Sequence, residues 1–265
     1  MGSVEALPPF GVSGSLPKEA WVTLVTRASY LPGAILLAHS LQKSQSRYPL
    51  IILTTATIPT SQIEPVVRTL QNTIHFQIDA LSPPPHNLPP SLIADRFADT
   101  WTKLRVFELY KYGCEKLVFL DADMLVRRNM DELFEVDLPK DWIAANHVCC
   151  CNLDKDAWAA DSWVSENCAY TGLKPGSDPT PVSGEEGLET HRLLNSGLFI
   201  FTTFEEQWKS VQEFLECDTR VKKYLFPDQD FLADFFKGRW KSVGWQYNAL
   251  KTMRYWHTSF WDDDE

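Results

Sequence analysis

The sequence predicts an α/β fold, a Rossmann-like nucleotide-binding sheet with helices on both faces. Apolar β-branched runs alternate with helical spacing over the first 80 residues. A continuous apolar run at 117–120 is typical of a strand buried on both faces. No internal repeat or linker interrupts the chain after a Pro-, Gly- and Ser-rich start. We therefore expect a flexible N-terminal arm at 1–18 and a single domain at 19–265.

The first third of the chain predicts a β-α-β-α-β order. Strands are expected at 21–26, 49–54 and 75–78, with helices at 31–43 and 60–70 between them. Such an order predicts a parallel sheet, which binds ligands beyond the carboxyl ends of its strands. Residues 26–30 and 121–123 both fall at that edge.

The remaining elements are less regular. Helices are expected at 101–112, 204–215 and 228–236, and strands at 117–120 and 193–202. Residues 141–190 are rich in Cys, Trp and Pro and lack a clear period. We expect this stretch to be an insert, serving as a lid or an acceptor platform.

Composition narrows the class of protein. Ten Trp exceed what a core normally needs, which favours a pocket or partner surface lined by some of them. A net charge of −10 argues against a nucleic-acid or anionic-membrane surface. No apolar stretch reaches the ~20 residues of a membrane span, and the N-terminus lacks a secretory signal. We expect a cytoplasmic protein with no nucleic-acid partner and no membrane span. Whether it forms a homodimer is left open.

The six cysteines include three in a row, Cys149, Cys150 and Cys151, and no C-x-x-C pair. Adjacent cysteines do not suit an ordinary disulfide framework. Reduced, mostly buried thiols are the favoured interpretation. A soft-metal site formed by 149–151 with His147 is the alternative.

Asp121 and Asp123 follow the buried strand at 117–120 and point to the same side of an extended chain. Two neighbouring carboxylates at the end of a buried strand repel each other and lose hydration, a cost that a cation between them offsets. Mg²⁺ and Mn²⁺ take oxygen ligands and leave positions open for phosphate oxygens. This pattern favours a metal–diphosphate site. An acidic turn that begins the next segment is the simpler alternative.

Several stretches together resemble glycosyltransferase family 8, which includes glycogenin and the galactinol synthases. They are WVTLVTRASYLPGAILLAHSL, TKLRVFEL, LVFLDADMLVRRNMDELF, LLNSGLFIF, FPDQDFLADFF and QYN, in this order. The resemblance runs from Trp21 to about Tyr255. It implies a GT-A fold, Mn²⁺ or Mg²⁺, a UDP-sugar donor, a small-molecule or glycan acceptor, and retention at the anomeric carbon.

The resemblance also implies roles for individual residues. Asp121 and Asp123 would be metal ligands, and the nucleotide would be held by Leu24, Thr26, Tyr30, Asp121, Ala122 and Asp123. The donor sugar would meet Lys103, Asn195, Ser196, Asp228 and Gln229, and the catalytic set would be Lys103, Asp228, Gln229 and Asp230. Gly197 would allow close backbone approach. Either a covalent glycosyl-carboxylate or front-face attack remains open as the mechanism.

The C-terminal part departs from the family pattern. Family members carry a His followed by a Gly and a Lys-Pro-Trp, with the His as a third metal ligand, and this chain has no such motif. His257 has the wrong surroundings for that ligand. Either the chain is a C-terminally truncated piece of a longer protein, which we favour, or water completes the site. With truncation we expect weaker metal and UDP binding than a longer relative shows. Tyr255 has the spacing of glycogenin's self-glucosylated tyrosine, but we expect a buried structural aromatic, because the Cys/Trp-rich stretch at 146–173 resembles the galactinol synthases.

The sequence therefore predicts a Mn²⁺-dependent retaining hexosyltransferase that uses UDP-glucose or UDP-galactose. A catalytically impaired UDP-binding scaffold of the same fold is one alternative. A metal-dependent nucleotidyl- or phosphotransferase is another, but it would need a Gly-rich phosphate loop that is not present.

Overall fold

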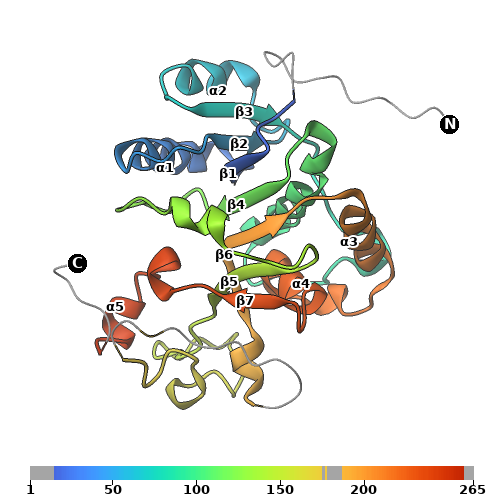
Figure 1. Ribbon diagram of the computed structural model, residues 1–265. Helices are drawn as coiled ribbons and strands as arrows, with labels where there is room; N and C mark the ends of the chain where they lie inside the picture. The colour runs from blue at the N-terminus through green and yellow to red at the C-terminus, as the bar shows by residue number, and fades with distance from the viewer. Residues whose placement is uncertain (1–14, 175–176, 178–186, 260–265) are drawn as a thin grey trace.

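A computed structural model describes residues 15–174, 177 and 187–259, and its centre is a seven-stranded mixed sheet (Figure 1). The strand order is β3-β2-β1-β4-β6-β5-β7. The strands are β1 (Glu19–Val25), β2 (Leu50–Thr54), β3 (Thr73–Gln77), β4 (Lys116–Leu120), β5 (Ile143–His147), β6 (Leu194–Thr202) and β7 (Trp240–Ser242).

The helical elements are α1 (Leu31–Lys43), α2 (Thr60–Val67), α3 (Glu205–Cys217), α4 (Pro227–Phe235) and α5 (Met253–Trp256). The 3₁₀ segments are η1 (Ala28–Tyr30), η2 (Pro85–Asn87), η3 (Asp95–Tyr112), η4 (Asp131–Glu135), η5 (Ser165–Asn167), η6 (Glu189–Arg192), η7 (Val221–Lys223) and η8 (Trp245–Asn248). The expected helix at 101–112 lies within η3, which is wound more tightly than an α-helix. None of the helices in the described ranges is long and apolar enough to span a membrane.

The first half of the sheet is parallel, as the β-α-β-α-β order predicts. β1 lies between β2 and β4, and β3 extends the sheet beyond β2, all with parallel pairing. Alternate side chains of β1 enter different cores: Trp21 and Val25 pack with α1 on one face, and Val22 packs with η3 on the other. Helices on both faces of the sheet are therefore confirmed.

The second half departs from a fully parallel sheet. β6 runs antiparallel to both β4 and β5, and β5 pairs in parallel with β7. Because β6 is reversed, its amino-terminal end lies beside the carboxyl end of β4, with Leu198 opposite Leu120. The start of β6 is thereby brought to the edge where the carboxyl ends of the parallel strands lie.

Two expected boundaries are wrong. The insert expected from residue 141 begins later, because β5 is a fully buried strand that pairs on both sides within the sheet. The arm expected at 1–18 is ordered from residue 15: Leu16 is buried in the core, and its N–H donates to the carbonyl of Tyr112 at 2.7 Å. Residues 1–14, and residues 178–186 of the insert, lie outside the described residues.

Candidate active site

The carboxyl ends of β1 and β4 and the amino-terminal end of β6 meet at one edge of the sheet. Asp121 follows the last residue of β4, and its N–H donates to the carbonyl of Gly197 in β6 at 2.8 Å. Four buried apolar residues of β4, 117–120, fix the strand in the core. The buried strand thus holds the Asp121-Ala122-Asp123 turn beside the polar start of β6.

Lys103 of η3 joins the separate parts of this site. Its Nζ lies 3.0 Å from Asp121 Oδ1 and 2.5 Å from Asp228 Oδ2, and it also donates to the Ser196 carbonyl at 3.2 Å. The Ser196 hydroxyl donates to the same Asp228 oxygen at 2.8 Å. The ammonium also lies 4.8 Å from the centre of the Phe119 ring. One lysine therefore connects β4, β6 and the first turn of α4.

The charges of this group shift each other's pKa. Burial opposes the charge on Lys103, but the carboxylates of Asp121 and Asp228 outweigh burial and raise the lysine's pKa. For Asp121, burial outweighs the nearby lysine and raises the pKa to about 6. For Asp228, burial is outweighed by Lys103 and Ser196, so its pKa is lowered. Two acids facing one lysine leave an excess negative charge, which favours a cation or other positive group at Asp121.

The start of β6 carries a second polar group, made of amides. Asn195 Oδ1 accepts hydrogen bonds from the Gly197 N–H and from the Asn248 side chain of η8, both at 2.8 Å. A Cβ on Gly197 would lie 3.0 Å from Asn195 Oδ1 and 3.1 Å from Asn248 Nδ2. The close approach at Gly197 is thus to the side-chain amides of Asn195 and Asn248. Their mutual hydrogen bond holds the Asn195 side chain in place at the start of β6.

The residues expected to hold the nucleotide lie along the end of β1. Leu24 is half-buried in β1, Thr26 directly follows the strand, and Tyr30 ends η1 with 37% of its surface exposed. The Thr26 carbonyl accepts a hydrogen bond from Thr57, and its hydroxyl lies 3.5 Å from Asp99 Oδ2. Tyr30 is therefore accessible at the start of α1, as stacking on a base would require.

Helix α1 contacts the acidic turn at Gly33. A Cβ on Gly33 would lie 2.4 Å from the Ala122 carbonyl oxygen, closer than real Cβ atoms come. Only a glycine lets α1 approach the turn this closely. The Gly33 contact therefore fixes the position of Asp121 and Asp123 relative to Tyr30.

The two acids of the 228–230 cluster, Asp228 and Asp230, differ in their surroundings. Asp228 is buried in the Lys103 group, whereas Asp230 Oδ2 accepts the backbone N–H groups of Leu225 and Phe226 at 2.8 and 3.0 Å. Burial raises the pKa of Asp230 to about 6 against these two bonds. Gln229 is half-buried between them in the sequence. The structure therefore brings Asp228, but not the Asp230 carboxylate, into contact with Lys103.

The acidic turn has the donor set that a hard divalent cation needs. Lys103 contacts Oδ1 of Asp121, so the fitting protein ligands are Asp121 Oδ2 and the exposed carboxylate of Asp123. All of these donors are oxygens, and the excess negative charge at the Lys103 group suits a cation. The residues present fit Mn²⁺ or Mg²⁺ held by two carboxylates, with the remaining positions left to phosphate oxygens and water.

Three further residues were singled out in the sequence. His257, which was not expected to be a ligand at the Asp121–Asp123 turn, faces the sulfurs of Cys149, Cys151 and Cys168. His147, the histidine of the alternative soft-metal site, packs its ring against Trp240 instead. Tyr255 is 65% exposed, so the expectation of a buried aromatic there is wrong.

Sequence reasoning missed Gly33 and left Asn248 without a role. The only signal for Asn248 is the Gln246-Tyr247-Asn248 stretch that resembles the family, and its contact with Asn195 spans 53 residues. For Gly33 no spacing rule exists, since its partner is a backbone carbonyl on another element.

The chain is similar to several known proteins. The chain is similar to galactinol synthase 2 of Arabidopsis thaliana, with 27% identity over 91% of the chain and 67% of the relative. It is 28% identical to galactinol synthase 1 of Solanum lycopersicum, over 90% of the chain and 66% of that relative.

Among solved structures it is similar to the glycosyltransferase GlyE of Streptococcus pneumoniae TIGR4, with a TM-score of 0.57 and 17% identity over 91% of this chain and 50% of GlyE. This likeness shows the GT-A fold. The family model of glycosyl transferase family 8 matches residues 21–263. The chain is a glycosyltransferase and belongs to glycosyltransferase family 8.

Proposed function

We propose that this protein transfers a hexose from a UDP-sugar to an acceptor hydroxyl, with retention at the anomeric carbon and with dependence on Mn²⁺. The observation that carries the proposal is the contact of Lys103 with both Asp121 and Asp228. It joins the turn that would hold the diphosphate to the helix that would hold the sugar.

The roles follow from the positions of the groups. Tyr30 and Thr26 would hold the uridine, while Asp121 and Asp123 would hold the cation. When bound, the cation would stabilise the negative charge on the departing diphosphate as a Lewis acid. Lys103 would supply further positive charge at the same phosphates, pre-positioned by Asp228 and Ser196.

The surroundings of the acids favour front-face attack over a covalent glycosyl-enzyme. A carboxylate is a weaker nucleophile when ion pairs and hydrogen bonds already stabilise its negative charge. Asp228 Oδ2 already accepts from Lys103 and Ser196, and Asp230 Oδ2 accepts two backbone N–H groups. Asp228 would then bind sugar hydroxyls through its other oxygen, Gln229 and Asn195 would orient the sugar, and the acceptor's proton would pass to the departing phosphate oxygen.

The donor and acceptor to test first follow from the relatives. Because the curated relatives are named galactinol synthases, UDP-galactose and galactinol formation come before UDP-glucose and other acceptors. Cytoplasmic placement and a homodimer remain predictions. A UDP-binding scaffold without activity is the alternative that the experiment must separate.

The experiment measures release of UDP and free or transferred sugar from UDP-galactose and UDP-glucose with Mn²⁺. Asp123→Asn should reduce the rate by about 100-fold or more, because a ligand to the diphosphate's cation is lost. Asp137→Asn, an exposed acid after η4, is the matched control and should keep the wild-type rate. Equal rates in both variants, or no turnover in the wild type despite tight Mn²⁺–UDP binding, would contradict the proposal.

A further inference from the structure

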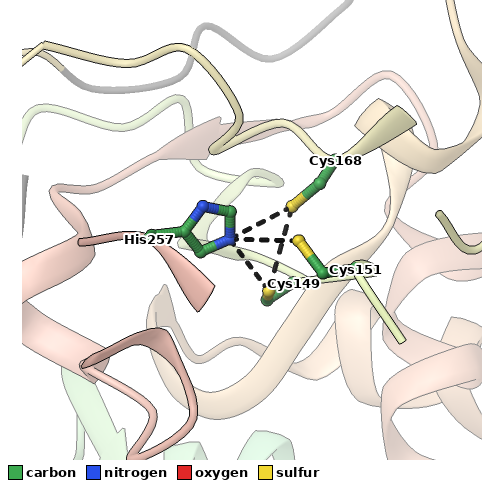
Figure 2. Close-up of side chains that lie close together, drawn as sticks. All are labelled: Cys149, Cys151, Cys168 and His257. Carbon is green, nitrogen blue, oxygen red and sulfur yellow. Dashed lines mark hydrogen bonds between the residues drawn. The ribbon is translucent and has the colours of Figure 1, made fainter. Parts of the chain in front are cut away.

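A second potential metal site, made of other residues than the acidic turn, lies around the side chain of His257 (Figure 2). The ligand atoms of Cys149, Cys151, Cys168 and His257 all lie within 4.8 Å of one another, and each residue is at least 93% buried. We propose that these four residues, here called the Cys₃His cluster, bind one structural Zn²⁺ ion.

The local chain geometry explains why two of the three consecutive cysteines face the cluster. Residues 148–151 continue beyond β5 without helical turns, so side chains two apart point to the same side. Cys149 and Cys151 therefore face His257. Cys150 is not one of the four grouped ligands: its thiol lies 3.5 Å from the Asn167 carbonyl and also contacts Cys168 from outside the group.

The other two ligands come from distant segments. Cys168 directly follows η5 in the irregular stretch after β5, and His257 follows α5, with its N–H bonded to the Met253 carbonyl at 2.8 Å. Met253 and Tyr170 pack around the same cysteines in a small core of their own. Figure 1 shows the stretch after β5 beside α5, far from β3. Three separate stretches of chain thus converge on one point.

The distances match the edges of a zinc tetrahedron. Zn–S bonds of about 2.3 Å and Zn–N bonds of about 2.05 Å place tetrahedral S···S pairs about 3.8 Å apart and S···N pairs about 3.5 Å apart. Nε2 of His257 lies 3.1, 3.3 and 3.6 Å from the sulfurs of Cys149, Cys151 and Cys168, and the Cys149 and Cys168 sulfurs are 3.9 Å apart. Four of the six distances are thus close to those of a zinc tetrahedron, and the remaining two S···S pairs lie within 4.8 Å.

The ligand chemistry selects the metal and the role. Three thiolates and one imidazole suit Zn²⁺, whereas Mg²⁺ and Mn²⁺ prefer the oxygen donors found at Asp121 and Asp123. Four buried protein ligands leave no open position for water or substrate, which is the pattern of a structural zinc ion. A Cys149–Cys168 disulfide would use only two of the four groups and leave His257 facing one unpaired thiol.

A zinc ion here would hold the C-terminal segment in place. His257 would tie α5 to the stretch after β5, and the chain between η8 and α5 is only 4 residues long, 249–252. η8 carries Asn248, which bonds Asn195 at the active site. The Cys₃His cluster would thus stabilise one side of the donor-sugar site without touching substrate.

The test uses the full chain without a histidine tag, purified under reducing conditions and analysed for metals by mass spectrometry. We expect about one zinc ion per chain, and replacement by Co²⁺ should give the visible absorption of a tetrahedral, thiolate-bound cobalt ion. This readout does not depend on glycosyl transfer, so its failure and the failure of the proposed function are distinguishable.

The variants Cys149→Ser and Cys168→Ser should bind zinc at least about 10-fold more weakly than the wild type. Cys150→Ser is the matched control: it changes an adjacent, equally buried thiol and should keep the bound zinc. If the ligand variants fail to fold, the cobalt spectrum of the wild type decides alone.

Three outcomes would overturn the proposal. These are wild-type protein that stays free of zinc after exposure to Zn²⁺, ligand variants that hold as much zinc as Cys150→Ser, and an intact mass showing a Cys149–Cys168 disulfide in place of metal.

Discussion

Lys103 connects the parts of the candidate site, although the residues that flank it in the sequence give no sign of this. The side chain is 7% exposed, and it contacts acids that lie 18 and 125 residues further along the chain. A buried carboxylate left without its lysine partner is costly, so the ion pairs of Lys103 contribute to stability. Under the proposed function the same lysine would also assist the transfer.

Replacing Lys103 by Met should lower the free energy of unfolding by about 3 kcal/mol and kcat/KM by about 100-fold or more. Urea unfolding and UDP release measure the two effects. Lys111→Met removes an exposed lysine paired with Glu108 and serves as the control, with little change in either quantity.

A double variant separates the two roles of Lys103. Adding Asp228→Asn to Lys103→Met removes the unpaired buried charge, so stability should recover while activity stays low. Recovery of activity together with stability would show that Lys103 acts only in folding.

Gly33 gives a second prediction at the scale of one residue. Gly33→Ala would place a Cβ 2.4 Å from the Ala122 carbonyl, so α1 or the acidic turn must shift. We expect Mn²⁺-dependent UDP affinity to fall about 10-fold or more, because small displacements of a positioned group are costly. Calorimetry with UDP and Mn²⁺ measures this.

Leu36→Ala is the control for Gly33, since it lies on the same helix and is 58% exposed. Unchanged affinity in Gly33→Ala would mean that α1 can retreat without moving Asp121 and Asp123.

The sequence predicts candidate site residues that lie next to a recognisable strand, but it does not predict contacts between residues that are far apart in the chain. Asp121 and Asp123 could be proposed as a site because they directly follow a strand that the apolar run located correctly. Tyr30 could be placed because the end of the first strand is visible in the pattern. The partner of Cys149 and Cys151 could not be found, since His257 lies more than 100 residues away and the nearby His147 was the natural candidate.

At the scale of elements, η4 is held to the segment after α1 by Asp131. Its carboxylate accepts from the Ser46 hydroxyl at 2.6 Å and from the Arg47 N–H at 2.9 Å. Burial would raise the pKa of Asp131, but these hydrogen bonds outweigh it and lower the pKa below its ordinary value of 3.8. A short acidic element is thereby fastened to the α1–β2 connection.

Asp131→Asn should lower the free energy of unfolding by about 2 kcal/mol at neutral pH. Because the folded-state pKa is depressed, the contribution of Asp131 is present above pH 3.8 and is lost as pH falls through the lower folded-state value. Urea unfolding of wild type and variant at pH 6 and pH 3 should therefore give a smaller difference at the lower pH.

Glu135→Gln is the control for Asp131, because Glu135 lies 3.9 Å from the same Arg47 but is 73% exposed. A difference between wild type and Asp131→Asn that grows toward acid pH would contradict the assignment.

The elements that sequence patterns located are the long and strongly apolar ones. Helix α1 and strands β1, β2, β4 and β6 were placed within two residues of their observed ends. β5 was missed because its Ala-Ala-Asn centre has little β propensity, and β7 because it has only three residues. The direction of β6 also could not be predicted, since it depends on pairing between strands far apart in the chain.

At the scale of the whole molecule, the two potential metal sites differ in ligand chemistry and would therefore have different roles. The carboxylate oxygens of Asp121 and Asp123 would suit an exchangeable cation that arrives with the diphosphate of the proposed donor. The Cys₃His cluster is closed and buried, and it connects the last described segment to the stretch after β5. A chelator should therefore remove the exchangeable cation first, which lowers activity, and the buried zinc ion later, which lowers local stability.

This arrangement predicts which part of the protein loosens when zinc is removed. Amide hydrogen exchange, compared with and without zinc, should rise first in residues 245–257 and in 148–170, while β1, β2 and β4 keep their protection. The reason is that the sheet core is formed by its own apolar layers, whereas the small core around Tyr170 and Met253 is centred on the cysteines. Through Asn248 the loosening should also reach Asn195, and the KM for the UDP-sugar should rise. The control, Cys150→Ser with zinc bound, should match the wild type. Exchange that rises evenly over the whole sheet would show instead that the ion supports the entire domain.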